Sequence, residues 1–293
     1  MSGRAAREQR LLLAPAALLL GAAVVAPIVR LVWLSLQRSE AFARSGSRFA
    51  GLESYARAWQ DGRWWAAIAH TSVFAGTSVA LELGLGIAFA LLLDCSFPGR
   101  RWVRAVVLVP WALPSAVMAL AWGWIFNDSF GVLNDLLTRF GLVHGPVAWL
   151  GQPGTAMAAM VVADVWKTTP FMALLILAGL QIIGADVYEA AKIDGANRWQ
   201  QFRYVTWPLV TPTTFFVLII STIALLVGAF DQISVMTNGG PLDASNVLVF
   251  NIYRTAFIYF QMGYASAMAY VLFLVVLGFT TVQWVLQKRW VHY

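Results

Sequence analysis

Long apolar runs alternate with short polar connections along the chain. Crossing a hydrocarbon core of roughly 30 Å takes about 20 helical residues, and six stretches are that long: approximately 11–36, 65–93, 105–125, 156–183, 212–230 and 264–286. Backbone groups inside a bilayer must be satisfied within their own segment, so runs of this length without strand alternation predict helices rather than a barrel. We therefore expect an all-α integral membrane protein with six transmembrane helices over residues 11–286, between tails at 1–10 and 287–293.

Two connections predict smaller elements. After Phe130 and Gly131, apolar residues recur at helical spacing as far as Phe140, which predicts a short amphipathic helix at the membrane interface. The run T-N-G-G-P at 237–241 predicts a turn after the fifth span.

The composition also indicates that much of the protein is surrounded by lipid. Of the 293 residues 60% are hydrophobic and 12% charged, about half the charged fraction of an ordinary soluble domain. The single cysteine, Cys95, excludes an internal disulfide, and the three histidines are too scattered for a metal-ligand set. Lys and Arg are spread between apolar runs rather than gathered on one face. We expect no metal, no cofactor in this chain and no nucleic-acid partner.

The distribution of basic residues predicts the orientation, because cytoplasmic connections carry more Lys and Arg. One set of alternate connections holds eleven: Arg4, Arg7, Arg10, Arg100, Arg101, Arg104, Lys192, Arg198, Arg203, Lys288 and Arg289. The other set holds seven: Arg38, Arg44, Arg48, Arg57, Arg63, Arg139 and Arg254. We therefore expect both termini, and the connection at about 184–211, to lie in the cytoplasm.

The connection at about 184–211 is unusually patterned. Asp186 followed by Glu189 has the spacing of a capping box, and Gly195 can adopt the positive φ that ends a helix. A second helical stretch is expected to end near Pro208, which completes a helix-turn-helix. Ala190 and Ala191 give a surface with little bulk, which lets another protein approach the backbone, and Arg198 and Arg203 offer charge at its rim. On composition alone, a long, well-capped loop without a partner is an equal alternative.

The same connection resembles the EAA loop of ABC-importer permeases. The matching positions are Glu189-Ala190-Ala191, Gly195, Val205, Trp207 and Pro208, where the family usually has Ile and Leu in place of Val205 and Trp207. The segments V-P-W-A-L-P-S, I-F-N-D-S-F-G-V-L-N, V-W-K-T-T-P-F and T-N-G-G-P resemble the carbohydrate-uptake subfamily, so the similarity runs from residue 11 onward. The resemblance implies the type I importer permease architecture. It implies coupling to an ATPase through Glu189, Ala190, Ala191, Asp194, Gly195, Arg198 and Pro208.

The sequence contains no recognisable motif for ATP hydrolysis. It has no G-x-x-x-x-G-K-[ST] phosphate loop, so we expect no enzyme activity and no catalytic residues here. ATP and Mg²⁺ are expected on separate subunits. The resemblance implies these partners: a second permease in a heterodimer, two ATP-binding subunits, a periplasmic or extracellular solute-binding protein and membrane lipid. It places the chain as a multi-pass protein in the cytoplasmic (inner) membrane of a prokaryote.

Polar side chains at bilayer depth are costly and mark a partner or a watery cavity. Asp164, Thr168 and Phe171 are spaced i, i+4, i+7 on one helix face, with Lys167 beside them. Together they suit a polyhydroxylated solute. An Asp164–Lys167 pair that serves helix packing is an equal alternative.

The third span adds two more candidates, Trp111 and Ser115. They are flanked by Pro110 and Pro114, and two prolines predict an irregular helix of the kind tolerated beside a cavity. The resemblance implies sugar-contacting positions at Trp111, Ser115, Asp164, Lys167, Thr168, Phe171 and Thr222. Two other charged residues at depth, Arg30 and Glu82, are assigned mainly to helix packing or snorkelling.

These observations predict a permease subunit for a di- or oligosaccharide or a sugar osmolyte. An alternative solute is glycerol-3-phosphate or another polyol, which several converging arginines would favour. A self-powered secondary transporter would instead show inverted repeats, and a membrane enzyme would need a nucleophile-base or metal constellation. Neither feature is apparent in the sequence.

Overall fold

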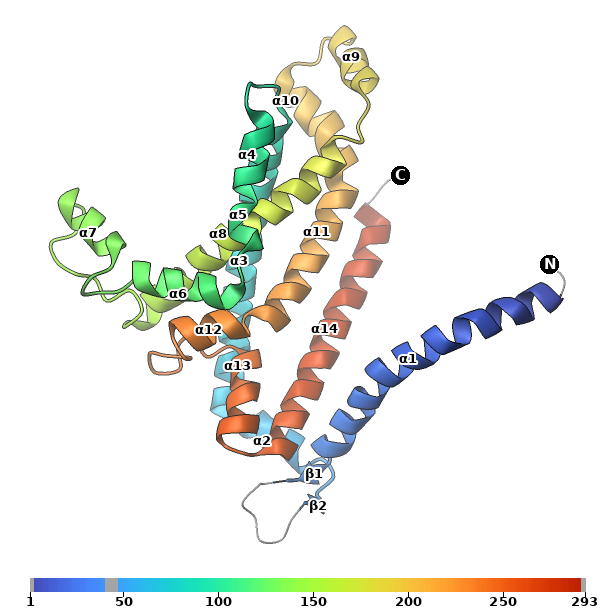
Figure 1. Cartoon of the computed structure of the whole chain (residues 1–293), viewed down its shortest axis with the longest axis vertical. Helices are drawn as coiled ribbons and strands as arrows, with labels where there is room; N and C mark the ends of the chain where they lie inside the picture. Colours follow the sequence, from blue (N-terminus) through green and yellow to red (C-terminus); the bar gives the residue numbers. More distant parts are fainter. Residues whose placement is uncertain (1–2, 40–46, 291–293) are drawn as a thin grey trace. The chain divides into compact units, whose positions relative to one another are not determined.

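The computed structural model describes residues 3–39 and 47–290, with side chains described from residue 12 to 287 within those ranges. Its elements, drawn in Figure 1, are α1 Gly3–Ser35, β1 Gln37–Arg38, β2 Arg48–Phe49, α2 Glu53–Gln60, α3 Gly62–Asp94, α4 Arg100–Val107, α5 Val109–Ala112, α6 Ser115–Ile125, α7 Val132–Arg139, α8 Pro153–Leu180, α9 Ala185–Ile193, α10 Arg198–Gln201, the π-helical turn η1 Phe202–Thr206, α11 Trp207–Gly228, α12 Phe230–Met236, α13 Leu248–Tyr253, the π-helical turn η2 Arg254–Ile258 and α14 Met262–Trp290. The tail boundaries at 10 and 287 stay predictions, because α1 and α14 run through them and residues 1–2 and 291–293 lie outside the described part.

Five described helices are long and apolar enough to cross a membrane: α1, α3, α8, the continuous stretch α10–η1–α11, and α14. A sixth crossing is present if α4–α5 and α6 count as one span, although they are bent by 92°. The break lies at Leu113, whose backbone is extended, because the following Pro114 disfavours helical backbone in the residue before it. The all-α membrane fold is confirmed, and the predicted irregularity of the third span proves to be a sharp break.

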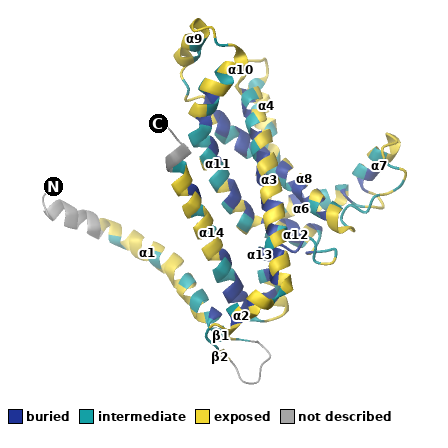
Figure 2. Cartoon of the chain, turned by 180° about the vertical axis from the view of Figure 1, so that it is seen from behind, coloured by how far each residue is buried: buried dark blue, intermediate teal, exposed yellow. Residues whose placement is uncertain are grey.

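The chain divides into two compact units, Met1–Trp65 with Asn251–Val275 and Ala66–Phe250 with Val276–Tyr293. In the first unit, β1 and β2 pair antiparallel, and Arg38 of β1 forms an ion pair of 3.0 Å with Glu53 of α2. Arg57 of α2 donates to Gln261 at 2.8 Å. The apolar window of α1 holds no buried residue, and Figure 2 accordingly draws most of the described part of this helix in yellow and teal.

The core of the second unit is organised around α8. This helix contributes residues to three buried clusters: with α3, α11 and α12 around Met160, with α3 and α11 around Ile176, and with α6 and α12 around Ala163. It is accordingly the most buried of the apolar spans described, and dark blue segments are visible along it in Figure 2. Polar side chains on α8 are therefore held within a packed scaffold.

The short helix and the turn predicted for two of the connections are confirmed, and the place of the helix at the membrane interface stays a prediction. The amphipathic helix is α7, held by Asn134, whose side chain bonds the backbone of Val147 and accepts from Trp149 Nε1 at 2.9 Å. The run at 237–241 forms a turn after α12, with positive φ at Asn238 and Gly239.

Candidate functional site

The connection between α8 and α11 folds as a helix-turn-helix. Its first helix, α9, ends at Ile193 and is followed by Asp194 and by Gly195, whose φ is +80°. The Gly195 amide donates to the Lys192 carbonyl at 3.0 Å and the Ala196 amide to the Ala191 carbonyl at 2.9 Å, the two bonds of a Schellman motif. The predicted helix end near Gly195 is confirmed.

The predicted capping box at Asp186 is wrong. α9 begins after Gly184 with no side-chain cap, and Asp186 lies inside its first turn, where a negative charge is favoured by the helix dipole. The capping box is at the start of α10 instead. There the Asn197 side chain accepts from the Gln200 amide at 2.9 Å and the Gln200 side chain accepts from the Asn197 amide at 2.8 Å. Asn followed three residues later by Gln was the signal that could have located it.

The predicted helix end near Pro208 is also wrong. α10 continues through η1 into α11, so residues Arg198–Gly228 form one helical stretch. In η1 the Trp207 amide bonds the Phe202 carbonyl, five residues back. Pro208 falls at the first turn of the α-helix that follows, where a missing N–H costs little. The π-helical turn therefore precedes Pro208, and the helical stretch continues through this proline without interruption.

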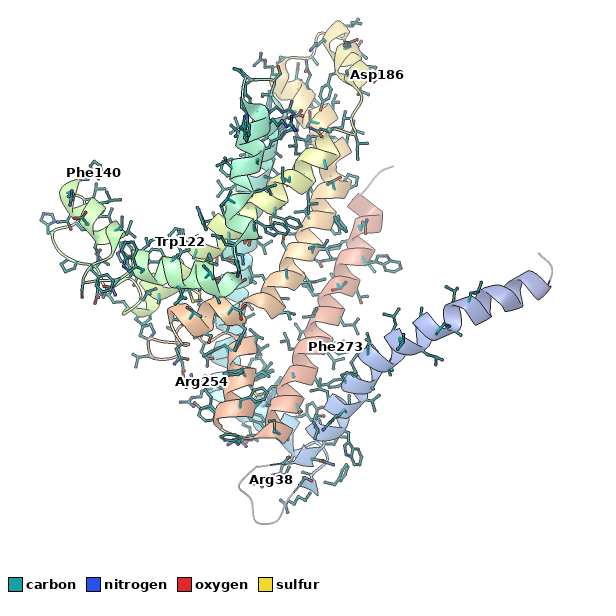
Figure 3. The ribbon with its side chains drawn as sticks, viewed as in Figure 1. Arg38, Trp122, Phe140, Asp186, Arg254 and Phe273 are labelled. Atoms are coloured by element: carbon teal, nitrogen blue, oxygen red, sulfur yellow. The ribbon has the colours of Figure 1, made fainter. Side chains whose placement is uncertain are left out.

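The helix-turn-helix lies at the end of the second unit where α8 ends and α11 begins (Figure 1). Figure 3 shows Asp186 on α9, whose side chains project outward there. Of the predicted coupling residues Ala191 is half-buried, and the exposed ones are Glu189, Ala190, Asp194, Gly195, Arg198 and Pro208. Two large apolar side chains are also exposed, Ile193 at 86% and Trp199 at 69%. A bond of 3.1 Å between the hydroxyls of Tyr188 and Thr206 ties α9 to η1.

A second site lies among the spans of the same unit. A cavity of about 180 Å³ is lined from α3, α6, α8, α11 and α12. Four predicted path residues meet in it: Ser115, Asp164, Lys167 and Thr168. The Lys167 ammonium of α8 donates to the hydroxyl of Ser115, the first residue of α6. It also interacts electrostatically with Asp164.

The two predicted aromatic residues meet each other. The rings of Trp111 and Phe171 stack with centroids 4.6 Å apart and an angle of 6° between planes. One face of each ring is therefore occupied by the other. Trp111 lies in α5 and Ser115 in α6, on the two sides of the break, and each reaches α8 through a contact of its own.

Two residues lie elsewhere than the sequence suggests. Thr222 does not line the cavity; it is buried and donates to the Leu218 carbonyl at 2.7 Å, while its neighbour Ser221 lines the cavity. Glu82, assigned to packing, lines the cavity from α3 and is only 1% exposed. Nothing short-range in the sequence links residue 82 to residue 164.

Residues 82–292 match the family described as "Binding-protein-dependent transport system inner membrane component". The chain belongs to this family. It is therefore a transmembrane permease subunit of an ABC transporter and an inner-membrane component, and the predicted family is confirmed. It is 42% identical over 262 residues to the trehalose/maltose transport system permease protein MalF of Thermococcus litoralis, covering 88% of this chain and 86% of that one.

Two further relatives carry names of other solutes. The sulfoquinovosyl glycerol permease SmoG of Agrobacterium fabrum is 37% identical, covering 90% of this chain and 84% of that one. The sn-glycerol-3-phosphate permease UgpA of the same organism is 31% identical, with coverages of 91% and 90%. Among solved structures, a bacterial alginate ABC transporter in complex with alginate pentasaccharide-bound periplasmic protein has a TM-score of 0.84 at 22% identity, covering 98% of this chain and 96% of that one. That likeness establishes the permease fold.

Proposed function

We propose that the chain moves a sugar, either a di- or oligosaccharide or a sugar osmolyte, across the cytoplasmic membrane. It does so as one half of a heterodimeric permease. Two ATP-binding subunits hold ATP and Mg²⁺ and power the transport, the chain itself has no enzyme activity, and a solute-binding protein delivers the sugar from outside. Both termini lie in the cytoplasm. The similarity to a trehalose/maltose permease at 42% identity supports the solute class.

The observation that carries the proposal is the exposed helix α9 at the end of the packed second unit. Its small residues, Ala190 and Ala191, let a groove of another protein approach the backbone closely. Ile193, beside them, presents an apolar side chain that a partner would bury. The Schellman motif and the capping box hold α9 and α10 in a fixed relation, as a transmitted movement requires.

The mechanism is alternating access. Closure of the ATPase subunits on ATP displaces α9, and α10–η1–α11 follows because the hydroxyls of Tyr188 and Thr206 join them. Rocking of the spans then exposes the path alternately to the two sides of the membrane. ATP must bind the closed state more tightly for this shift to occur. The path residues are Trp111, Ser115, Asp164, Lys167, Thr168, Phe171 and Thr222, with Thr222 acting from outside the cavity lining.

Cysteine crosslinking tests the proposal. In a Cys95→Ser background, Ile193→Cys is expected to crosslink to an ATPase subunit of the assembled transporter, and the crosslink yield is read on a denaturing gel. The matched control is Leu242→Cys, since Leu242 is 94% exposed but lies in the connection after α12. Crosslinking of Leu242→Cys to the ATPase, with Ile193→Cys unreactive toward it during normal uptake, would contradict the proposal.

A further inference from the structure

Two carboxyl groups meet in the wall of the cavity among the spans. Glu82 of α3 is the one Asp, Glu, Lys or Arg side chain that is buried among those the structure describes. Its carboxyl group lies at hydrogen-bonding distance from that of Asp164 in α8. An ionised carboxylate can only accept hydrogen bonds. Two ionised carboxylates in contact therefore repel each other and give each other no hydrogen bond.

The oxygens of this pair show what two ionised groups would lack. With both groups ionised, Oε1 and Oε2 of Glu82 and Oδ2 of Asp164 are buried without a donor in the part of the chain that the structure describes. Buried acceptors without a donor are costly, at bilayer depth above all. One proton held between the two groups relieves the cost, because it turns one oxygen into a donor and removes one of two like charges.

The surroundings of the pair place the remaining negative charge on Asp164. This carboxylate interacts with the Lys167 ammonium and with the hydroxyl of Ser78 on α3, and a buried charge is best placed beside an opposite one. The other charged group that acts on Lys167, among the described residues, is Asp231 of α12. Glu82 is thus the member of the pair that is suited to carry the proton.

We propose that Glu82 carries a proton and is a positioning residue for the solute path: it donates a hydrogen bond to Asp164 and holds that carboxylate against Lys167. This inference rests on the proposed function, in which the cavity is part of the path. Because Lys167 in turn donates to Ser115, the first residue of α6, one series of polar contacts joins α3, α8 and α6. The lining then carries one carboxylate and one ammonium, which balance each other.

Infrared spectroscopy of the whole transporter, with both permeases and the ATPase subunits in nanodiscs, tests the proton. A protonated carboxyl group has a carbonyl stretch that a carboxylate lacks. At about pH 7, where an ordinary glutamate is ionised, this band is expected in wild type and is expected to be lost in Glu82→Gln. In Asp164→Asn the band is expected to shift, because the acceptor of the hydrogen bond changes. Glu53→Gln, in the exposed helix α2, is the control and is expected to leave the band unchanged.

Two variants of similar size separate the hydrogen bond from packing. Glu82→Gln keeps a side-chain donor, whereas Glu82→Met has none. Uptake of radiolabelled trehalose into proteoliposomes with the solute-binding protein is measured per assembled transporter. It is expected to stay within about twofold of wild type in Glu82→Gln and to fall at least about tenfold in Glu82→Met.

The possible failures differ from one another. A wild type without the band overturns the proton on Glu82, and a band that Asp164→Asn leaves in place overturns the pairing. Equal uptake by Glu82→Gln and Glu82→Met overturns the positioning role. A wild type that takes up no trehalose contradicts the proposed solute class for this probe, while a band that is lost in Glu82→Gln and shifted in Asp164→Asn still supports the protonated pair.

Discussion

Gly195 and Gly141 end two different helices by the same backbone geometry. Gly195 follows α9 with a φ of +80°, and Gly141 follows α7 with a φ of +67°. A hydrogen bond of 2.9 Å from the residue after each glycine closes the last helical turn. Added Cβ atoms would meet open space at both positions. The cost of a side chain at either position is therefore backbone strain, of about 1–2 kcal/mol, rather than a clash.

Gly195→Val is expected to uncouple ATP hydrolysis from uptake, because strain at this turn changes how α9 is presented to the ATPase. Sugar taken up per ATP hydrolysed should fall by about 5- to 30-fold, the factor that corresponds to 1–2 kcal/mol. Both rates are measured on the same proteoliposomes. Gly141→Val is the matched control, since it carries equal strain outside the coupling loop. Normal coupling in Gly195→Val would remove this turn from the mechanism.

Single residues also mark where sequence reasoning stops. The spacing of Asp164, Lys167 and Thr168 was sufficient to place them together, because one helix carries all three. The position of Glu82 on the cavity wall was not predicted, because its neighbours there come from other helices. That position depends on the packing of α3 against α8, which no local pattern encodes.

At the scale of elements, α8 and α11 approach one another unusually closely. The closeness depends on Gly179 of α8, where an added Cβ would lie 2.6 Å from Oγ1 and 2.8 Å from Cβ of Thr213 in α11. Because the branched carbon of Thr213 is itself within that distance, rotation of the side chain cannot relieve the overlap. The glycine therefore sets the separation of two helices that line the cavity.

Gly179→Ala is expected to destabilise the protein by about 1–3 kcal/mol through overpacking. The apparent melting temperature in detergent should fall accordingly. Gly76→Ala in α3 is the control, because nothing lies within 4 Å of its added Cβ and alanine favours a helix by up to about 1 kcal/mol. Equal melting temperatures for Gly179→Ala and wild type would show that α8 and α11 do not pack so tightly.

Hydropathy predicted five of the spans and their approximate ranges, because burial in lipid imposes a length that apolar runs record directly; the sixth is present only if the bent pair α4–α5 and α6 counts as one span. It did not predict the two departures from regular helices. Pro114 signals irregularity at Leu113, but it does not specify the 92° bend after which α6 packs against α8 and α12. Pro208 was expected to end a helix, yet a π-helical turn accommodates it. A proline restricts the chain locally without specifying which of these outcomes its surroundings favour.

At the scale of the whole molecule, the two units differ in how much they bury. In the second unit α8 packs on several helices, whereas the apolar window of α1 in the first unit has no buried residue. Such a helix requires lipid, or the apolar surface of another protein, around it. The proposed second permease would supply part of that surface.

The chain purified alone is expected to show no ATP hydrolysis, because it lacks a phosphate loop. The rate of phosphate release from the purified chain should equal that of empty detergent micelles. The complete transporter, prepared in the same detergent, is the positive control. ATPase activity that co-elutes with the isolated chain would contradict the assignment of energy supply to separate subunits.

The unbroken stretch from Arg198 to Gly228 has a mechanical consequence. Its 31 residues at about 1.5 Å each make a rod of about 46 Å. One end adjoins the surface that α9 presents, and the other contributes Ser221, Ala224, Leu225 and Gly228 to the cavity wall. Because one continuous helix joins the two sites, no series of side-chain contacts between them is needed. A tilt of this helix at its α9 end would also displace its cavity end.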